Sequence, residues 1–205
     1  PDVYSHSSIR NLYLDTPDFR LIRRSLEKPV YKEKLRLRSY GRTERDSPVF
    51  MELKKKYRSI VYKRRLTLPY DRALDCLTGA CPWPETQIGG EIRYTVDFYP
   101  DLESRVFLAY ERDSWLAPES GLRITFDDAI RFRTEELTLD SDPWGTALLG
   151  PDQVLMELKA PGAIPLWMVR LLTEMRLYKT SFSKYGTAYQ LLLEREWKDL
   201  LTKVK

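Results

Sequence analysis

The chain has 205 residues, of which 42% are hydrophobic and 31% are charged, and its formal net charge is +4. This composition is that of a globular protein with a single core, and it excludes an intrinsically disordered chain. No apolar run approaches the ~20 residues that a membrane-spanning helix needs.

Strands and helices follow one another in the first half of the chain. Thr16 and Pro17 place an N-cap residue before a proline that fits the first helical turn, and Gly79 is a typical residue at a helix end. A tight turn at 57–59 joins two long strands as a hairpin. The predicted strands cover 9–15, 33–39, 51–56 and 60–66, and the predicted helices cover 17–26 and 69–79. Residues 91–99 fit a helix or a strand, and a helix is preferred.

Strands return in the second half, and two amphipathic helices close the chain. The predicted strands cover 105–113, 122–127, 130–133 and 153–159, and the predicted helices cover 164–175 and 184–197. This order is typical of an α+β protein built on a largely antiparallel sheet. Each strand has an apolar face and a charged face, so one face lies inside a closed or strongly curved sheet and helices cover the other. A charged face inside gives a cationic lumen, and a charged face outside gives an apolar one.

Positive charge recurs at every second residue in several of these strands. In Lys34-Leu35-Arg36-Leu37-Arg38, a β-strand directs all three cations to one face and both leucines to the other. The same spacing returns in Glu52-Leu53-Lys54-Lys55-Lys56 and in Val61-Tyr62-Lys63-Arg64-Arg65. The cations therefore form a stripe on one set of strand faces.

A count over six strand windows, 33–39, 51–56, 60–66, 106–112, 122–127 and 154–159, tests this stripe. One face collects ten cations, Lys34, Arg36, Arg38, Lys54, Lys56, Lys63, Arg65, Arg112, Arg123 and Lys159, and three acids, Glu52, Asp127 and Glu157. The opposite face carries no net charge. Like charges on neighbouring strands repel, so the stripe favours a site for a polyanion. A solvated outer face of the sheet is the alternative, although such faces usually mix both signs.

Several kinds of active site are excluded by the residues that the chain lacks. The only histidine is His6, so a nucleophile activated by histidine has no credible base. There is no GxxxxGK[ST] loop and no GxGxxG after a strand, so phosphate would have to be bound by side chains. Cys76 and Cys81 are too few for a zinc site and indicate free thiols in a reducing compartment, which predicts a cytoplasmic protein.

The acids of the cationic face are candidates for binding a metal. Glu157, Glu52 and Asp127 offer the hard oxygen ligands that Mg²⁺ prefers, with water and phosphate completing the shell. Their alternative role is that of counter-ions for neighbouring cations, such as Lys159 for Glu157. Ser183 is typical of a helix cap, whereas Lys184 at a helix start indicates an anion nearby.

Eight motifs occur in an order that resembles the vacuolar transporter chaperone (VTC) domain in its bacterial form. They are residues 9–19 (IRNLYLDTPDF), 34–41 (KLRLRSYG), 51–54 (MELK), 61–65 (VYKRR), 110–112 (YER), 122–127 (LRITFD), 156–159 (MELK) and 181–186 (SFSKYG). The resemblance covers nearly the whole chain, and eight ordered motifs are far more specific than any single one.

The resemblance implies a fold and an activity. The family belongs to the triphosphate tunnel metalloenzymes, in which a closed antiparallel β-barrel with flanking helices surrounds a lumen lined by Arg, Lys and Glu. It implies a polyphosphate polymerase that takes the γ-phosphate of ATP, releases ADP and lengthens a polyphosphate chain with Mn²⁺ or Mg²⁺. We therefore expect a single domain over 1–205 that lacks the family's first strand, which carries a tunnel lysine.

The resemblance also implies roles for individual residues. The catalytic cations would be Arg36, Arg38, Lys54, Lys63 and Arg112. Further phosphate contacts would come from Arg123, Ser183 and Lys184, with Glu157 as the metal ligand. Lys34, Arg65 and Lys159 join the phosphate-binding set, and Glu52 and Asp127 the metal set, through the strand pattern and the metal argument above.

Other functions remain open at this point. A triphosphate hydrolase could use the same barrel, and a non-catalytic module could bind polyphosphate or inositol phosphates through the same cations. The expected partners are ATP and polyphosphate; a membrane-protein partner stays open. Nucleic acid is disfavoured, because leucines rather than aromatic residues alternate with the cations. Replacing Arg36 and Arg38 by alanine is expected to abolish triphosphate binding and to leave the fold intact or more stable.

Overall fold

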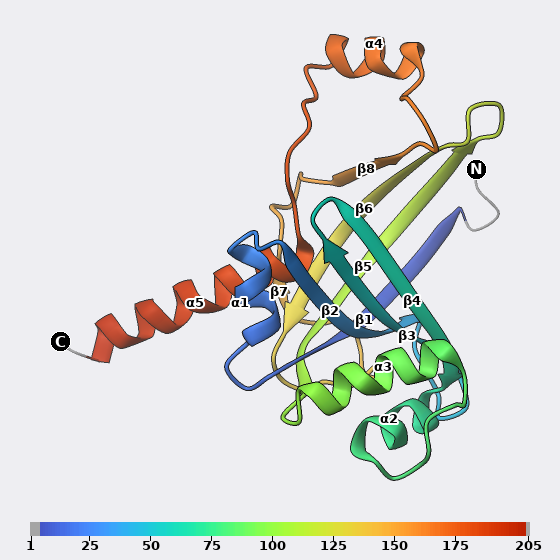
Figure 1. The fold of residues 1–205 in the computed structure, drawn as a ribbon. Coiled ribbons are helices and arrows are strands. Elements are labelled where there is room, and N and C mark those ends of the chain that lie inside the picture. The colour runs from blue at the N-terminus through green and yellow to red at the C-terminus, as the bar shows by residue number, and fades with distance from the viewer. Residues whose placement is uncertain (1–4, 204–205) are drawn as a thin grey trace.

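A computed structural model describes residues 5–203, in which an eight-stranded antiparallel sheet is combined with five helices (Figure 1). The strands are β1 His6–Asp15, β2 Tyr31–Tyr40, β3 Pro48–Tyr57, β4 Ile60–Pro69, β5 Glu103–Ala117, β6 Leu122–Arg133, β7 Thr146–Ala147 and β8 Leu155–Lys159. The helices are α1 Arg20–Leu26, α2 Tyr70–Thr78, α3 Gln87–Phe98, α4 Leu166–Glu174 and α5 Lys184–Lys203. The protein is thus α+β, as the sequence predicts.

The sheet has free edges. Its strand order is β4-β3-β2-β1-β5-β6-β7, and β8 also pairs with β6. Within residues 5–203, β4 pairs only with β3 and β8 only with β6, so these strands do not join into a ring. The closed barrel expected from the resemblance is therefore not confirmed by this sheet.

The apolar face of β2 and β3 is covered by helices, as the alternation predicts. Leu35, Leu37 and Leu53 are fully buried in a core that also contains Ala73 of α2 and Ile92 of α3. Because side chains alternate along a strand, burying these leucines turns Lys34, Arg36 and Arg38 to the opposite face. Figure 1 shows α2 and α3 together beside β3 and β4.

A second apolar cluster lies on the same face as the cations, over the middle strands. Tyr13 of β1 and Tyr110 of β5 pack in it with Tyr185 of α5. The Tyr13 and Tyr185 rings are stacked, with centroids 4.4 Å apart. The beginning of α5 is thereby held against the centre of the charged face.

The first helix begins later than the sequence predicts. The expected start was Pro17, but α1 begins at Arg20 because Phe19 adopts a left-handed conformation with φ of 57°. The hydroxyl of Thr16 accepts a hydrogen bond from the Arg20 amide, and the Asp15 carboxylate accepts from the amides of Leu21 and Ile22. Capping is therefore shared by the last strand residue and the turn that follows it.

The remaining elements agree with the prediction in type and differ mainly at their ends. The predicted strands 122–127 and 130–133 form one strand, β6, which continues through Ala129 with φ of 45°. Helix α4 buries only Met168 fully and stands apart from the sheet (Figure 1). The sulfur atoms of Cys76 and Cys81 are unbonded and 3.2 Å apart. No helix among the described residues is long and apolar enough to cross a membrane.

Candidate functional site

Strand register brings the cations of β2, β3 and β4 into rows across the sheet. Lys34 lies opposite Lys54, which lies opposite Lys63 on the next strand. One step further along, Arg36 lies opposite Glu52 and Glu52 opposite Arg65. The alternation seen in each strand thus becomes a cationic surface that is three strands wide.

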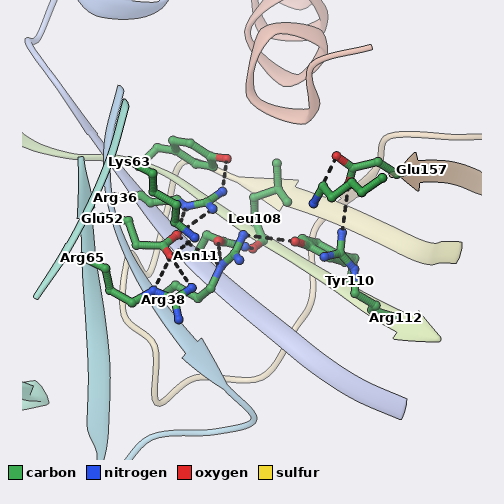
Figure 2. A network of polar contacts seen from close by, with 12 residues as sticks. Asn11, Arg36, Arg38, Glu52, Lys63, Arg65, Leu108, Tyr110, Arg112 and Glu157 are labelled. Atoms are coloured by element: carbon green, nitrogen blue, oxygen red, sulfur yellow. Dashed lines mark hydrogen bonds and ion pairs between the residues drawn. The ribbon is translucent and has the colours of Figure 1, made fainter. Parts of the chain in front are cut away.

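Glu52 lies at the centre of the first cluster (Figure 2). Its Oε2 atom accepts hydrogen bonds from Arg36 Nε at 2.9 Å and from Arg36 Nη2 at 2.7 Å. Its Oε1 atom accepts from Arg65 Nε at 2.8 Å and from Arg65 Nη2 at 2.6 Å, and Lys63 Nζ lies 2.7 Å from the same oxygen. Arg38 is a fourth neighbour, with its Nε 3.8 Å from Oε2.

Glu52 is charged despite being only 2% exposed. Burial raises the pKa of its carboxyl, but Arg36 and Arg38, together with the hydrogen bond from Lys63, outweigh burial and hold the pKa far below its ordinary value. Glu52 is therefore a saturated counter-ion. The alternative reading of this acid, as a partner for neighbouring cations, describes its contacts better than a metal ligand does.

The same contacts change the expected effect of removing Arg36 and Arg38. From the sequence alone, replacing both arginines by alanine is expected to relieve repulsion among the cations. In the structure, this double substitution removes two partners of the buried Glu52 carboxylate, so the expected result is a less stable fold.

Three residues of the middle strands orient the arginines. Tyr13 receives a hydrogen bond on its hydroxyl from Arg36 Nη1 at 2.9 Å. Asn11 accepts one from Arg38 Nε at 3.0 Å, and Tyr110 accepts one from Arg38 Nη2 at 3.3 Å. Asn11 and Tyr13 were not predicted as site residues, although their two-residue spacing on β1 could have placed them on this face. Tyr110 also packs in the second apolar cluster.

Asp127 organises a second cluster, on β5, β6 and α5. Its two oxygens accept hydrogen bonds from Arg112 Nε at 2.5 Å and Arg112 Nη2 at 2.7 Å, and Lys184 also donates to it. Asp127 is fully buried. Burial raises its pKa, whereas Arg112 and Lys184 lower it more, so the carboxylate stays charged. Like Glu52, Asp127 serves as a counter-ion in this structure.

The start of α5 supplies two of the predicted side chains to this face. Ser183 caps the helix, because its Oγ atom accepts from the Gly186 amide at 3.1 Å, and it also accepts from Lys34 Nζ at 3.0 Å. The Lys184 ammonium lies 4.5 Å from the centroid of the Tyr110 ring. Burial lowers the pKa of Lys184, and Asp127 opposes that change. Ser183 is therefore the helix cap, and the anion beside Lys184 in this structure is the carboxylate of Asp127.

Tyr110 connects the two clusters. Arg38 reaches its hydroxyl from one side, while Arg112 lies 5.3 Å from its ring centroid on the other. Figure 2 shows the Glu52 cluster and the Arg112 side chain on either side of this tyrosine. A network of polar contacts thus runs from β4 to β8.

Glu157 differs from the other two acids. It is 45% exposed, and it forms looser ion pairs, with Lys159 Nζ at 3.4 Å and Arg112 Nη2 at 3.8 Å. Its oxygens are therefore more accessible to a ligand than those of Glu52 and Asp127. No group of three or more acidic, histidine or cysteine side chains among the described residues could hold a metal without other ligands.

The structure brings most of the predicted residues together. Arg36, Arg38, Lys63 and Arg65 surround Glu52, while Arg112, Lys184 and Glu157 gather near Asp127. Lys34 and Lys54 lie one row away from Glu52. Arg123 and Lys159 are exposed and lie opposite each other on β6 and β8, where Lys159 Nζ is 3.4 Å from Glu157. The roles assigned to these residues stay predictions.

Comparisons with known proteins agree with this picture. A family model described as "VTC domain" matches residues 2–193. No curated protein gives a significant match. Among solved structures, the chain is similar to a candidate adenylate cyclase from Bacillus halodurans, with a TM-score of 0.51 and 14% identity over 88% of this chain and 81% of that one. At that identity the likeness concerns the fold alone.

Proposed function

Because this chain belongs to the VTC domain family, whose model matches residues 2–193, we propose that it is a polyphosphate polymerase of the triphosphate tunnel type. The proposed reaction transfers the γ-phosphate of ATP to the end of a polyphosphate chain and releases ADP. The closed tunnel is part of the same proposal. A tunnel would form only if the free edges of β4 and β8 were joined.

One observation carries the proposal: two clusters of arginine and lysine lie on one sheet face and are joined through Tyr110. Phosphoryl transfer needs donor and acceptor held in line and the spreading negative charge neutralised, with little covalent help from the protein. Arginine forks can bind two phosphate oxygens at a time. Arg36 and Arg65 on one side and Arg112 on the other would offer such forks to phosphate groups that displace their present carboxylate partners, Glu52 and Asp127.

A divalent cation fits this site at Glu157. Mg²⁺ is commonly held by one or two carboxylates, with waters and substrate phosphates completing the shell. Glu157 has available oxygens, whereas those of Glu52 and Asp127 are occupied by cations. When bound, Mn²⁺ or Mg²⁺ would neutralise phosphate charge next to Glu157.

ATP and polyphosphate are the proposed partners, and the aromatic residues of this face argue against nucleic acid. Tyr13 and Tyr110 are buried beneath the cations instead of being exposed for base stacking.

Incubation of the protein with ATP and Mn²⁺ tests the proposal. We expect a ladder of polyphosphate on a gel, together with release of ADP. Glu157→Gln should lower the rate at least ~100-fold, because the carboxylate that would hold the cation is lost, while tripolyphosphate still binds. Glu174→Gln on α4 makes the same chemical change away from the sheet and should leave the rate unchanged.

Three other results would contradict the polymerase. Release of orthophosphate without a ladder indicates a hydrolase. Tight binding of polyphosphate without metal, with no turnover and no effect of Glu157→Gln, indicates a binding module. Absence of any binding to tripolyphosphate removes the phosphate site altogether.

A further inference from the structure

Four lysines form two rows across β2 and β3, near the start of β2 and the end of β3. Lys34 lies opposite Lys54, and Lys32 lies opposite Lys56. All four belong to the cationic face, because each is an even number of residues from Arg36 on β2 or from Glu52 on β3. Lys32 and Lys56 are half-buried, so their positions are restricted by the fold.

These lysines lack the internal compensation that the arginines have. Arg36 and Arg65 share Glu52, and Arg112 shares Asp127 with Lys184. By contrast, Lys32 donates to the carbonyl of Ser25 and Lys34 to the hydroxyl of Ser183, both neutral acceptors. Among the ion pairs formed by residues 5–203, none includes Lys32, Lys34, Lys54 or Lys56.

Burial and mutual repulsion disfavour the charged forms of Lys32 and Lys34. Burial lowers the pKa of Lys32, and the charges of Lys56, Lys54 and Lys28 lower it further. Burial also lowers the pKa of Lys34, with Lys32 and Lys54 contributing in the same direction. A bound anion would relieve this repulsion.

Distance along the strand separates this group from the arginine cluster. Four residues of β-strand cover roughly 13 Å, so Lys32 lies that far from Arg36. A triphosphate bound at Arg36 and Arg65 is too short to reach the row of Lys32 and Lys56 as well. A longer phosphate chain would reach both.

We infer that Lys32 and Lys56 form a subsite for the extended part of a polyphosphate chain, beyond the phosphates bound at the arginine cluster. This inference rests on the proposed function and adds to it a preference for long chains. The subsite holds phosphates through lysine point charges, so among polyphosphates the chain length decides whether it is occupied.

The experiment measures affinity for tripolyphosphate and for a long-chain polyphosphate with the intact protein. The double variant Lys32→Ala/Lys56→Ala should weaken binding of the long chain roughly tenfold more than binding of tripolyphosphate, since each lost phosphate contact removes part of a salt-dependent affinity. The slope of log K against log salt concentration for the long chain should fall by about 1 to 2. Enzymatic rates are not needed for this readout.

Lys55 provides a matched control. Lys56→Ala and Lys55→Ala remove the same charge from adjacent residues of β3, but Lys55 belongs to the opposite face, where it contributes to the field at Glu91. Lys56→Ala should reduce affinity for the long chain, and Lys55→Ala should not.

The outcomes separate this inference from the proposed function. Equal losses for both phosphate probes, or equal effects of Lys55→Ala and Lys56→Ala, would overturn the subsite while leaving the phosphate site in place. Failure of the unmodified protein to bind either probe would instead contradict the proposed function. Equal affinity for single-stranded DNA of similar length would identify a general polyanion site and overturn the preference for polyphosphate.

Discussion

Four cationic side chains lie around Glu52, and without it their mutual repulsion would weaken the strands that carry them. The carboxylate is buried, so it is itself costly to ionise unless it is paired. Each group therefore stabilises the other, and the cluster is held in place before any phosphate arrives.

Replacing Glu52 by glutamine should lower the free energy of unfolding by about 3 kcal/mol, because Arg36 and Arg38, which are largely buried, lose their counter-ion. Urea unfolding followed by circular dichroism measures this change. Glu91→Gln is the control, since Glu91 pairs with Arg64 nearer the surface and its loss should cost less than ~1 kcal/mol. Equal effects of the two variants would show that Glu52 is not a structural centre.

The same comparison has a defined pH dependence. The pKa of Glu52 is far lower in the folded protein than the ordinary value of about 4.3. The contribution of Glu52 to folding stability is therefore complete at pH values above its ordinary pKa, and it is lost as pH falls through the pKa of the folded protein. The stability difference between wild type and Glu52→Gln should stay constant from pH 7 to near pH 5 and shrink below about pH 4.

At the scale of elements, Asp15 joins β1 to two helices. Its carboxylate accepts hydrogen bonds from the amides of Thr16, Leu21 and Ile22, and from the hydroxyl of Tyr185 at 2.8 Å. Asp15 is fully buried. One side chain thus fixes the start of α1 and the first turn of α5, which carries Lys184 toward the charged face.

Asp15→Asn should destabilise the protein by about 2 kcal/mol or more, because the amide replaces one acceptor oxygen by a donor that faces other donors. Thermal and urea unfolding measure the loss. Asp18→Asn changes an exposed carboxylate three residues away and should have a smaller effect. Tripolyphosphate affinity should also fall in Asp15→Asn, since α5 positions Ser183 and Lys184. An unchanged affinity would show that α5 is positioned independently of Asp15.

Strand parity is the part of the fold that the sequence predicts best. A two-residue rhythm fixes which face each side chain occupies, so the common surface of Arg36, Lys54 and Lys63 could be inferred without coordinates. Apolar spacing and a terminal glycine predicted a helix over 69–79, which the structure has at Tyr70–Thr78. The pattern over 91–99 fitted a helix or a strand, with helix preferred, and the structure has a helix at Gln87–Phe98.

Features that depend on three-dimensional neighbours were less predictable. Parity places Glu52 on the cationic face but does not say that Arg36 and Arg65 will occupy both of its oxygens, because that depends on register between strands. The start of α1 was misplaced because Phe19 takes a left-handed conformation that no propensity favours. Closure of the sheet depends on edges that a strand pattern does not describe.

At the scale of the whole molecule, charge is unevenly distributed. The net charge is only +4, yet ten cations and three acids share one face of the strands. The positive field at this face is stronger than the net charge of the chain indicates, so it should attract polyanions. Salt should weaken this attraction by screening the charges.

Tripolyphosphate should therefore raise the melting temperature. At a concentration 100 times its Kd, binding to the folded state contributes about 2.7 kcal/mol, which corresponds to roughly 5 to 10 °C for a chain of this size. Differential scanning fluorimetry at low salt measures this shift, and 1 M NaCl should remove most of it. A shift that is insensitive to salt would indicate binding by contacts other than charge.

The carboxylate at the centre of the arginine cluster would also make the proposed phosphate site selective. An incoming anion would have to displace Glu52, which is tethered beside the same nitrogens at a high effective concentration. Chloride, acetate or a single phosphate would carry too few charges to displace it, whereas a linked series of phosphates would contact several neighbouring cations at once. Under the proposed function, Glu52 would thus favour polyvalent anions over small ones.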